Sequence, residues 1–326
     1  MQALTELFLQ NFLGKPVWVW FAFLATVVCL LSFDLGVLHK KEREINVKES
    51  LFLSAGYIAI AVLFGCWVWW FFGATSGTDF FTAYLVEKSL SMDNVFVIAL
   101  IFMHLQIPRV YQHRVLFWGI LGVIVLRAIM IGLGAALVSQ FSWMLYIFGA
   151  FLVITGIKMW LLADKEPDIE NNAVLKFLRK HMRVTHEVKS KAFIVKKPHP
   201  QTGKPVIWAT PLLLALCLVE IIDLVFAVDS VPAVFSITDD TFIVYTSNIF
   251  AILGLRALYF ALAAMIHRFQ YLKYALALVL VFIGGKIFMV EFVGKIPASI
   301  SLGVTFGLLA MGVIFSLFKT RTAKVE

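Results

Sequence analysis

Long apolar stretches separated by short polar segments make up most of this chain. Runs long enough to cross a hydrocarbon core, about 20 residues each, begin near nine positions: Val17, Leu51, Phe80, His113, Ser142, Ala209, Phe242, Tyr271 and Ile296. The connections are mostly short, which favours antiparallel helical neighbours, and the polar stretch from Asp164 to Trp208 is the exception. The pattern predicts an all-α polytopic membrane protein with nine transmembrane helices.

Composition agrees with this prediction. Hydrophobic residues make up 61% of the 326 residues and charged residues 15%, against about 45–50% and about 25% in soluble domains. The net charge of +8 could indicate nucleic-acid binding, but the basic residues lie mostly in loops beside the spans. A lipid bilayer is therefore the expected surroundings, and we expect no nucleic-acid partner.

The positions of the basic residues predict the orientation. They fall in the loops after the first, third, fifth and seventh spans and in the C-terminal tail, whereas the other side holds only Lys15 and Lys295. Because cytoplasmic loops carry the excess of Lys and Arg, we expect the N-terminus outside and the C-terminus and the long loop in the cytoplasm.

Polar landmarks recur in the same order in two parts of the chain. The pairs, spaced 130, 129 and 128 residues apart, are Asp93 with Asp223, Arg127 with Arg256, and Lys158 with Lys286. Each copy would hold three spans, so the second enters the membrane from the opposite face. Inverted repeats of this kind are typical of secondary transporters, whose substrate site lies at mid-depth between the copies. The predicted divisions are an N-terminal two-span segment (1–79), the first repeat (80–163), the cytoplasmic loop (164–208), the second repeat (209–293), and a final span with its tail (294–326).

Acidic residues lie inside two of the predicted spans, where an ionisable group is costly unless it faces the bundle interior or a water-filled cavity. The candidate metal ligands are Glu87, Asp93, Asn94, Glu220, Asp223, Asp229 and Ser230. Oxygen ligands of this kind suit manganese(II), calcium or magnesium. Because no histidine falls in the cluster, a zinc or copper site is not expected, nor is a prosthetic group.

Helical spacing affects which of these acids can meet. Glu220 and Asp223 share a helix face, whereas Asp229 lies about 120° round from Asp223 on a straight helix. Pro232 removes a hydrogen-bond donor, and we expect it to break the helix so that Asp229 and Ser230 turn toward the same cavity. Asp93 and Asp223 are expected to meet near the membrane centre.

Basic residues within the spans offer an alternative, in which the acids are held in structural ion pairs. The candidate charge partners are Arg127, Arg256 and Lys88. Lys158 and Lys286 lie near opposite membrane ends, where long side chains reach the interface. The remaining acidic residues within the spans outnumber the remaining basic ones, so the net charge at the membrane centre is negative, which favours a cation or proton site.

The long loop contains two patterns of its own. Apolar residues recur at helical spacing from Ala173 to Arg183, as in a helix lying on the membrane surface. Residues 193–195 and 206–208 predict two short strands around a Pro/Gly turn. The loop is either a solvated connector or a gating or partner-binding element.

The segments EKSLSMDNVFV, YIFGAFLVITGIKMW and ATPLLLALCLVEIIDLVFAVDSVPAVF resemble the tellurite-resistance TerC (Alx-type) family of integral membrane proteins, and the resemblance covers nearly the whole chain. It implies a nine-span protein of the bacterial inner membrane linked to metal homeostasis, with manganese efflux as the activity of several members. The family's acidic positions carry over onto the candidate ligands named above. The family name concerns tellurite, but we expect no site for this oxyanion, because the predicted membrane centre is acidic.

Three functions remain open at this point. The first is export of manganese(II), with protons as the exchanged ion and calcium as another cargo. The second is an intramembrane aspartyl protease, in which two aspartates share a proton; however, Asp223 follows Ile-Ile and not the Gly-x-Gly of that enzyme class. The third is an interaction factor that assists membrane-protein assembly or a stress response through residues 164–208.

Overall fold

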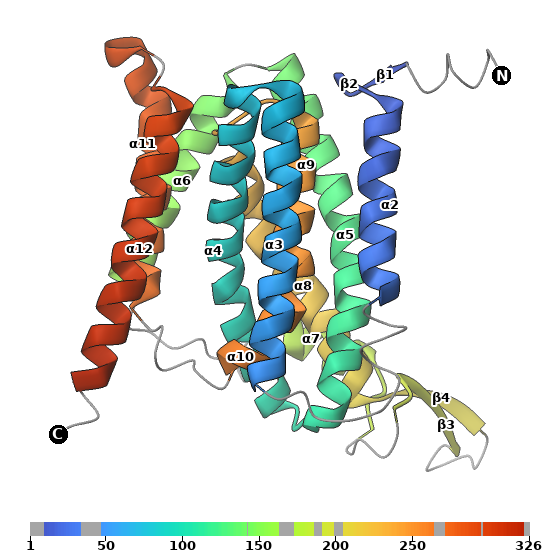
Figure 1. Cartoon of the computed structure of the whole chain (residues 1–326). Helices are drawn as coiled ribbons and strands as arrows, with labels where there is room; N and C mark the ends of the chain where they lie inside the picture. Colours follow the sequence, from blue (N-terminus) through green and yellow to red (C-terminus); the bar gives the residue numbers. More distant parts are fainter. Residues whose placement is uncertain are drawn as a thin grey trace.

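A bundle of long helices forms the body of the protein (Figure 1). The computed structural model describes residues 10–33, 47–141, 143–162, 173–185, 191–198, 205–263, 271–294 and 296–322. The bundle helices are α2 (Val17–Phe33), α3 (Val47–Phe72), α4 (Ala74–His104), α5 (Arg109–Gln140), α6 (Met144–Leu161), α8 (Pro211–Phe235), α9 (Thr241–Leu253), α10 (Leu255–Ala263), α11 (Leu272–Val293) and α12 (Ala298–Thr322).

Six of these helices are long and apolar enough to cross a membrane: α3, α5, α6, α8, α11 and α12. Two further apolar helices, α2 and α9, are shorter. Large apolar side chains face outward from the bundle, as Phe52 and Trp70 on α3 do with 80% and 81% of their surface exposed. In water such a surface would be unstable, so lipid is its natural surroundings. The chain is an all-α polytopic membrane protein.

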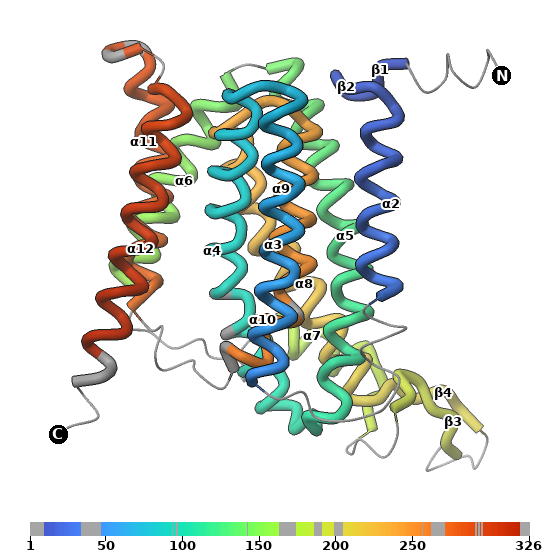
Figure 2. The backbone as a smooth tube through the Cα atoms, viewed as in Figure 1, coloured from blue at the N-terminus to red at the C-terminus, as the bar shows by residue number. Residues whose placement is uncertain are grey.

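The helices fall into two groups that meet at the centre of the bundle (Figure 2). Helices α6, α11 and α12 lie together on one side, and α2, α3, α5 and α9 lie on the other, with α4 and α8 between. Helices α6 and α11 approach closely because Gly156 and Gly284 have no side chain at their contact: a Cβ on Gly284 would lie 2.6 Å from the carbonyl oxygen of Gly149.

Aromatic rings fill the core between α2, α3, α4 and α9. Phe23, Phe80 and Phe242 are almost fully buried there, and the rings of Phe64 and Phe250 lie 4.7 Å apart between centroids. Such large buried side chains dominate the packing energy of a core, and they fix the position of α4, which carries part of the candidate site.

The apolar run from Phe242 predicts a single span, but the structure divides it into α9 and α10 at Gly254. Just before this interruption, the backbone carbonyl of Ala251 accepts a hydrogen bond from the Lys88 ammonium at 3.1 Å. A buried lysine therefore satisfies a carbonyl at the C-terminal end of α9, where helices leave carbonyl groups without backbone partners.

The long loop forms helix α7 (Ala173–His181) and the antiparallel strands β3 (Ile194–Pro198) and β4 (Pro205–Ala209). The predicted hairpin is thus present. The prediction that the apolar face of this helix lies on the membrane surface is wrong. Leu175 is only 2% exposed, and Val174 and Leu178 pack with it on the core of the bundle. A second small hairpin, β1 (Asn11–Phe12) and β2 (Lys15–Pro16), precedes α2.

Candidate functional site

The guanidinium of Arg127 lies at the centre of a buried polar cluster and joins α5 to α4 and α8. Its Nε and Nη2 donate to the two carboxylate oxygens of Asp223 at 3.1 and 3.2 Å. Its Nη1 donates to Glu87 Oε1 at 2.8 Å. Glu87 is 0% exposed and Arg127 1%, so these ion pairs are largely removed from screening by water. The two-pronged contact with Asp223 uses the geometry in which arginine binds carboxylates best.

Neutral polar side chains complete the cluster. Arg127 Nη1 also lies 2.7 Å from Ser230 Oγ and 3.3 Å from Asn248 Oδ1. Asn94 Nδ2 donates to Asp223 Oδ1 at 3.2 Å and so connects α4 directly with α8. The structure therefore brings together four of the predicted residues (Glu87, Asn94, Asp223 and Ser230) with one predicted charge partner.

Helix α8 is unbroken from Pro211 to Phe235 although it contains Pro232, so the predicted helix break is wrong. Pro232 lies three residues from the last helical residue, and the helix loses only the hydrogen bond that its nitrogen would have donated. Asp229 consequently stays on a different side of the helix from Asp223. It faces α6, where Thr155 Oγ1 donates to its Oδ1 at 3.4 Å.

Glu220 faces α5, as Asp223 does. Its carboxylate lies directly against the backbone of Gly122, in the space where any larger residue would place its Cβ. Glu220 Oε2 is buried and has no hydrogen-bond partner among the described residues. Glu220 and Asp223 thus both contact α5, at Gly122 and at Arg127, whereas Asp229 contacts α6. Within the part of the chain that the structure describes, no three His, Cys, Asp or Glu side chains converge as a metal-binding group.

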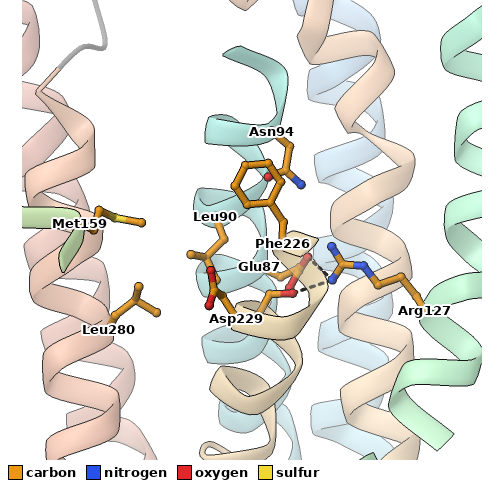
Figure 3. Close-up of a pocket in the computed structure, with 9 residues that line it drawn as sticks. Glu87, Leu90, Asn94, Arg127, Met159, Phe226, Asp229 and Leu280 are labelled. Atoms are coloured by element: carbon orange, nitrogen blue, oxygen red, sulfur yellow. Dashed lines mark hydrogen bonds and ion pairs between the residues drawn. The ribbon is translucent and has the colours of Figure 1, made fainter. Parts of the chain in front are cut away.

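A small cavity of about 30 Å³ adjoins the cluster (Figure 3). Its lining consists of Glu87, Leu90, Asn94, Arg127, Met159, Phe226, Asp229, Ser230 and Leu280. Two lining oxygens, Glu87 Oε2 and Asn94 Oδ1, are buried without a hydrogen-bond partner among the described residues. The cavity has room for about two water molecules, or an ion and a water. Apolar Met159 and Leu280 lie across from the acids, on α6 and α11.

Lys88, Asp93 and Arg256 are predicted residues for which no contact with the Arg127 cluster is described. Lys88 is buried but bonds the Ala251 carbonyl on α9, and no ion pair between it and Glu87 is found among the described side chains. Asp93 and Arg256 lie in α4 and α10, but their side chains are outside the described part of the structure. The expected meeting of Asp93 with Asp223 therefore stays a prediction.

Two polar contacts were not anticipated from the sequence. Asn248 reaches Arg127 from α9, and the three consecutive polar residues Thr246, Ser247 and Asn248 inside an apolar helix were the available signal. Thr155, which bonds Asp229, is a single threonine in an apolar run. Threonine in such helices commonly bonds the preceding turn of its own backbone, so its sequence offers no comparable signal.

Comparison with known proteins finds a match to the family model described as "Integral membrane protein TerC family" over residues 72–324. An uncharacterized membrane protein of Myxococcus xanthus is 48% identical over 310 residues, which are 95% of each chain. An uncharacterized membrane protein of Rickettsia felis is 47% identical over 300 residues, 92% of this chain and 97% of that one. An Escherichia coli K12 protein, named "Putative membrane-bound redox modulator Alx", is 44% identical over 316 residues, 94% and 96% of the two chains.

No solved structure matches this chain. The family match covers more than half of the residues and includes α4, α5 and α8, the helices that carry the buried cluster. The relatives match over nearly their entire lengths. The chain belongs to the TerC family of integral membrane proteins.

Proposed function

We propose that the chain is a secondary transporter that exports divalent cations, above all manganese(II), from the cytoplasm in exchange for protons. Calcium, which prefers the same oxygen ligands, is a second candidate cargo. The proposed direct ligands are Glu87, Asn94, Asp229 and Ser230 at the cavity. The other acidic residues of the two repeats, Asp223, Glu220 and Asp93, would line the route of the cation to and from this cavity.

The observation that carries this proposal is the excess of negative charge around a cavity with unpartnered oxygens. When ionised, Glu87, Asp223, Asp229 and the neighbouring Glu220 carry four negative charges. Arg127 and Lys158, which interacts electrostatically with Asp229, carry two positive charges, so these six side chains leave a net charge of −2. Buried carboxylates without full compensation are costly in a membrane. One divalent cation would balance this charge and would also supply a partner for Glu87 Oε2 and Asn94 Oδ1.

Arg127 has a defined part in this proposal. It holds Glu87 Oε1 and both oxygens of Asp223, which leaves Glu87 Oε2 and the Asp229 carboxylate for the cargo. Protons and a divalent cation compete for the same carboxylate oxygens. Binding of one therefore favours release of the other, which is the thermodynamic requirement for exchange.

Reciprocal contacts between α6 and α11 support the inverted repeat. The 128-residue offset of the repeat pairs Gly156 with Gly284, and Gly149 with Ala277. A Cβ on Gly156 would lie 2.8 Å from the carbonyl oxygen of Ala277, and one on Gly284 would lie 2.6 Å from that of Gly149. Exchanging the two copies turns one contact into the other, as a two-fold axis between them requires.

We further propose nine crossings, formed by the six helices that satisfy the length and composition of a span together with α2, α4 and the α9–α10 pair. In the bacterial inner membrane, the N-terminus would then lie outside and the C-terminus in the cytoplasm. The support is the concentration of basic residues at one end of the bundle, which is expected of the cytoplasmic side.

The proposal is tested by elemental analysis of cells that lack their own manganese exporters and express this chain under manganese load. We expect the wild-type chain to lower cellular manganese and Asp229→Asn to fail at equal protein level. Asp239→Asn, the same substitution at an exposed residue beyond the end of α8, is the matched control and should behave as wild type. If cells expressing Asp229→Asn and cells expressing Asp239→Asn contained the same amount of manganese, the site assignment would be contradicted.

A further inference from the structure

The β3–β4 hairpin presents one face that the rest of the described protein leaves uncovered. Lys196 pairs with Ile207 and Ile194 with Ala209, and residues directly opposite in a two-stranded sheet project to the same side. Ile194 and Ile207 are 55% and 63% exposed, and Pro198 and Pro205 at the end of the pairing are exposed too. We call the surface formed by Ile194, Lys196, Pro198, Pro205 and Ile207 the hairpin face.

The base of the hairpin is joined to the segment after α7 and to the start of α8, and its opposite side packs on the bundle. Ala209 N donates to the carbonyl of Arg183, and Thr210 N donates to that of Phe193, both at 2.9 Å. The ring of Phe193 packs against the bundle core and lies 5.4 Å from the Arg114 guanidinium. These contacts hold the hairpin in place while the hairpin face stays open.

The hairpin projects sideways from one end of the bundle, beyond the end of α2 (Figures 1 and 2). With the long apolar helices crossing the bilayer, this end of the bundle would lie at the level of the lipid headgroups. The described residues between 173 and 209 include no Asp or Glu but have seven basic residues: Lys176, Arg179, Lys180, Arg183, Lys191, Lys196 and Lys197. The electrostatic complement of such a segment is a negatively charged surface.

We propose that the hairpin face docks on negatively charged lipid headgroups beside this end of the bundle. Ile194 and Ile207 would enter the interfacial layer, and the Lys196 ammonium between them would pair with lipid phosphates, as in other interfacial elements that combine apolar and basic residues. The face is too small for a stable protein interface, which takes about 20–30 residues from each side. A lipid surface sets no such minimum.

Docking of the hairpin would act directly on helix α8, because the hairpin and α8 are adjacent in the chain. β4 ends at Ala209 and α8 begins at Pro211, with the buried Thr210 hydroxyl donating to the carbonyl of Ala192 at 2.8 Å. The position of the hairpin against the bilayer therefore fixes the start of the helix that carries Glu220, Asp223 and Asp229.

The test uses the full chain, with its three native cysteines replaced, in nanodiscs of phosphatidylcholine with or without phosphatidylglycerol. A nitroxide attached at Ile207→Cys reports exposure to a water-soluble paramagnetic nickel complex by electron paramagnetic resonance. We expect several-fold lower exposure when phosphatidylglycerol is present. A nitroxide at Lys197→Cys, the neighbour of Lys196 on the other side of the hairpin, should stay exposed in both lipids.

Charge reversal supplies the matched comparison. Lys196→Glu, on the hairpin face, should largely restore the exposure of the label at position 207, whereas Lys197→Glu, with the same change of charge, should have a smaller effect. Equal exposure of this label with and without phosphatidylglycerol would overturn the proposal. Protection only in native membranes, and not in nanodiscs, would also overturn it and would indicate a protein partner.

Discussion

Replacing Arg127 by methionine removes the positive charge between two buried carboxylates without a large change in side-chain volume. The wild-type guanidinium donates three hydrogen bonds to Glu87 and Asp223, at 2.8, 3.1 and 3.2 Å. Removing one partner of a buried ion pair costs about 3–5 kcal/mol. Because Arg127→Met leaves two carboxylates uncompensated, we expect a loss at the upper end of this range, about 5 kcal/mol.

Arg127→Lys separates charge from geometry. Lysine keeps the positive charge but cannot form the two-pronged contact with Asp223, and one lost hydrogen bond to a charged group is worth about 1.5–3 kcal/mol. We expect Arg127→Lys to lie midway between wild type and Arg127→Met. Adding Glu87→Gln to Arg127→Met should recover part of the lost stability, because one buried charge is then removed.

The assay is reversible unfolding of the purified protein by sodium dodecyl sulfate in mixed micelles, followed by tryptophan fluorescence. Arg109→Met, at an exposed position of the same helix, is the control and should change the free energy of unfolding by no more than about 0.5 kcal/mol. If Arg127→Met were as stable as Arg109→Met, the ion pairs would not contribute as argued and the buried cluster would need another explanation.

Two glycine substitutions test the packing around the site, each against a glycine of the same helix with open space around it. Gly122→Ala should displace the Glu220 carboxylate and lower manganese transport in everted membrane vesicles. Gly132→Ala, with nothing within 4 Å of the new Cβ, should leave transport unchanged. Equal transport by both variants would refute a role for the contact between Glu220 and Gly122. Gly284→Ala should destabilise the protein by about 1–3 kcal/mol through overpacking against α6. Gly285→Ala, with nothing within 4 Å of the new Cβ, should leave the stability unchanged. Equal unfolding curves for these two variants would contradict the close contact between α6 and α11.

The apolar runs were sufficient to predict a helical membrane protein, and the Pro/Gly turn in the loop was sufficient to predict the hairpin. Two other predictions failed for physical reasons. The division at Gly254 could not be predicted, because a single glycine within an apolar run is common in membrane helices. Pro232 was predicted to break α8, but a proline so near a helix end disturbs little of the helix.

The candidate site was only partly predictable. Intramembrane acids are strong signals, and Glu87, Asn94, Asp223 and Ser230 do come together. Which base pairs with which acid depends on helix rotation and tilt, so Arg127 could be named as a charge partner but not as the residue that joins two acids. Helical spacing already places Glu220 with Asp223 and turns Asp229 away from them on an unbroken helix, but that α5 and α6 are the helices they contact follows only from the packing of the bundle.

Export of a divalent cation through the cavity beside Glu87 and Asp229 can be measured directly as flux in proteoliposomes. Purified protein would be reconstituted with a manganese-sensitive fluorophore inside the vesicles and a proton gradient across the membrane. We expect manganese uptake that depends on the gradient, falls to the rate of protein-free liposomes in Asp229→Asn, and persists in Asp239→Asn. Uptake by Asp229→Asn at the wild-type rate, or no uptake by the wild-type protein under either direction of the gradient, would contradict export through this cavity.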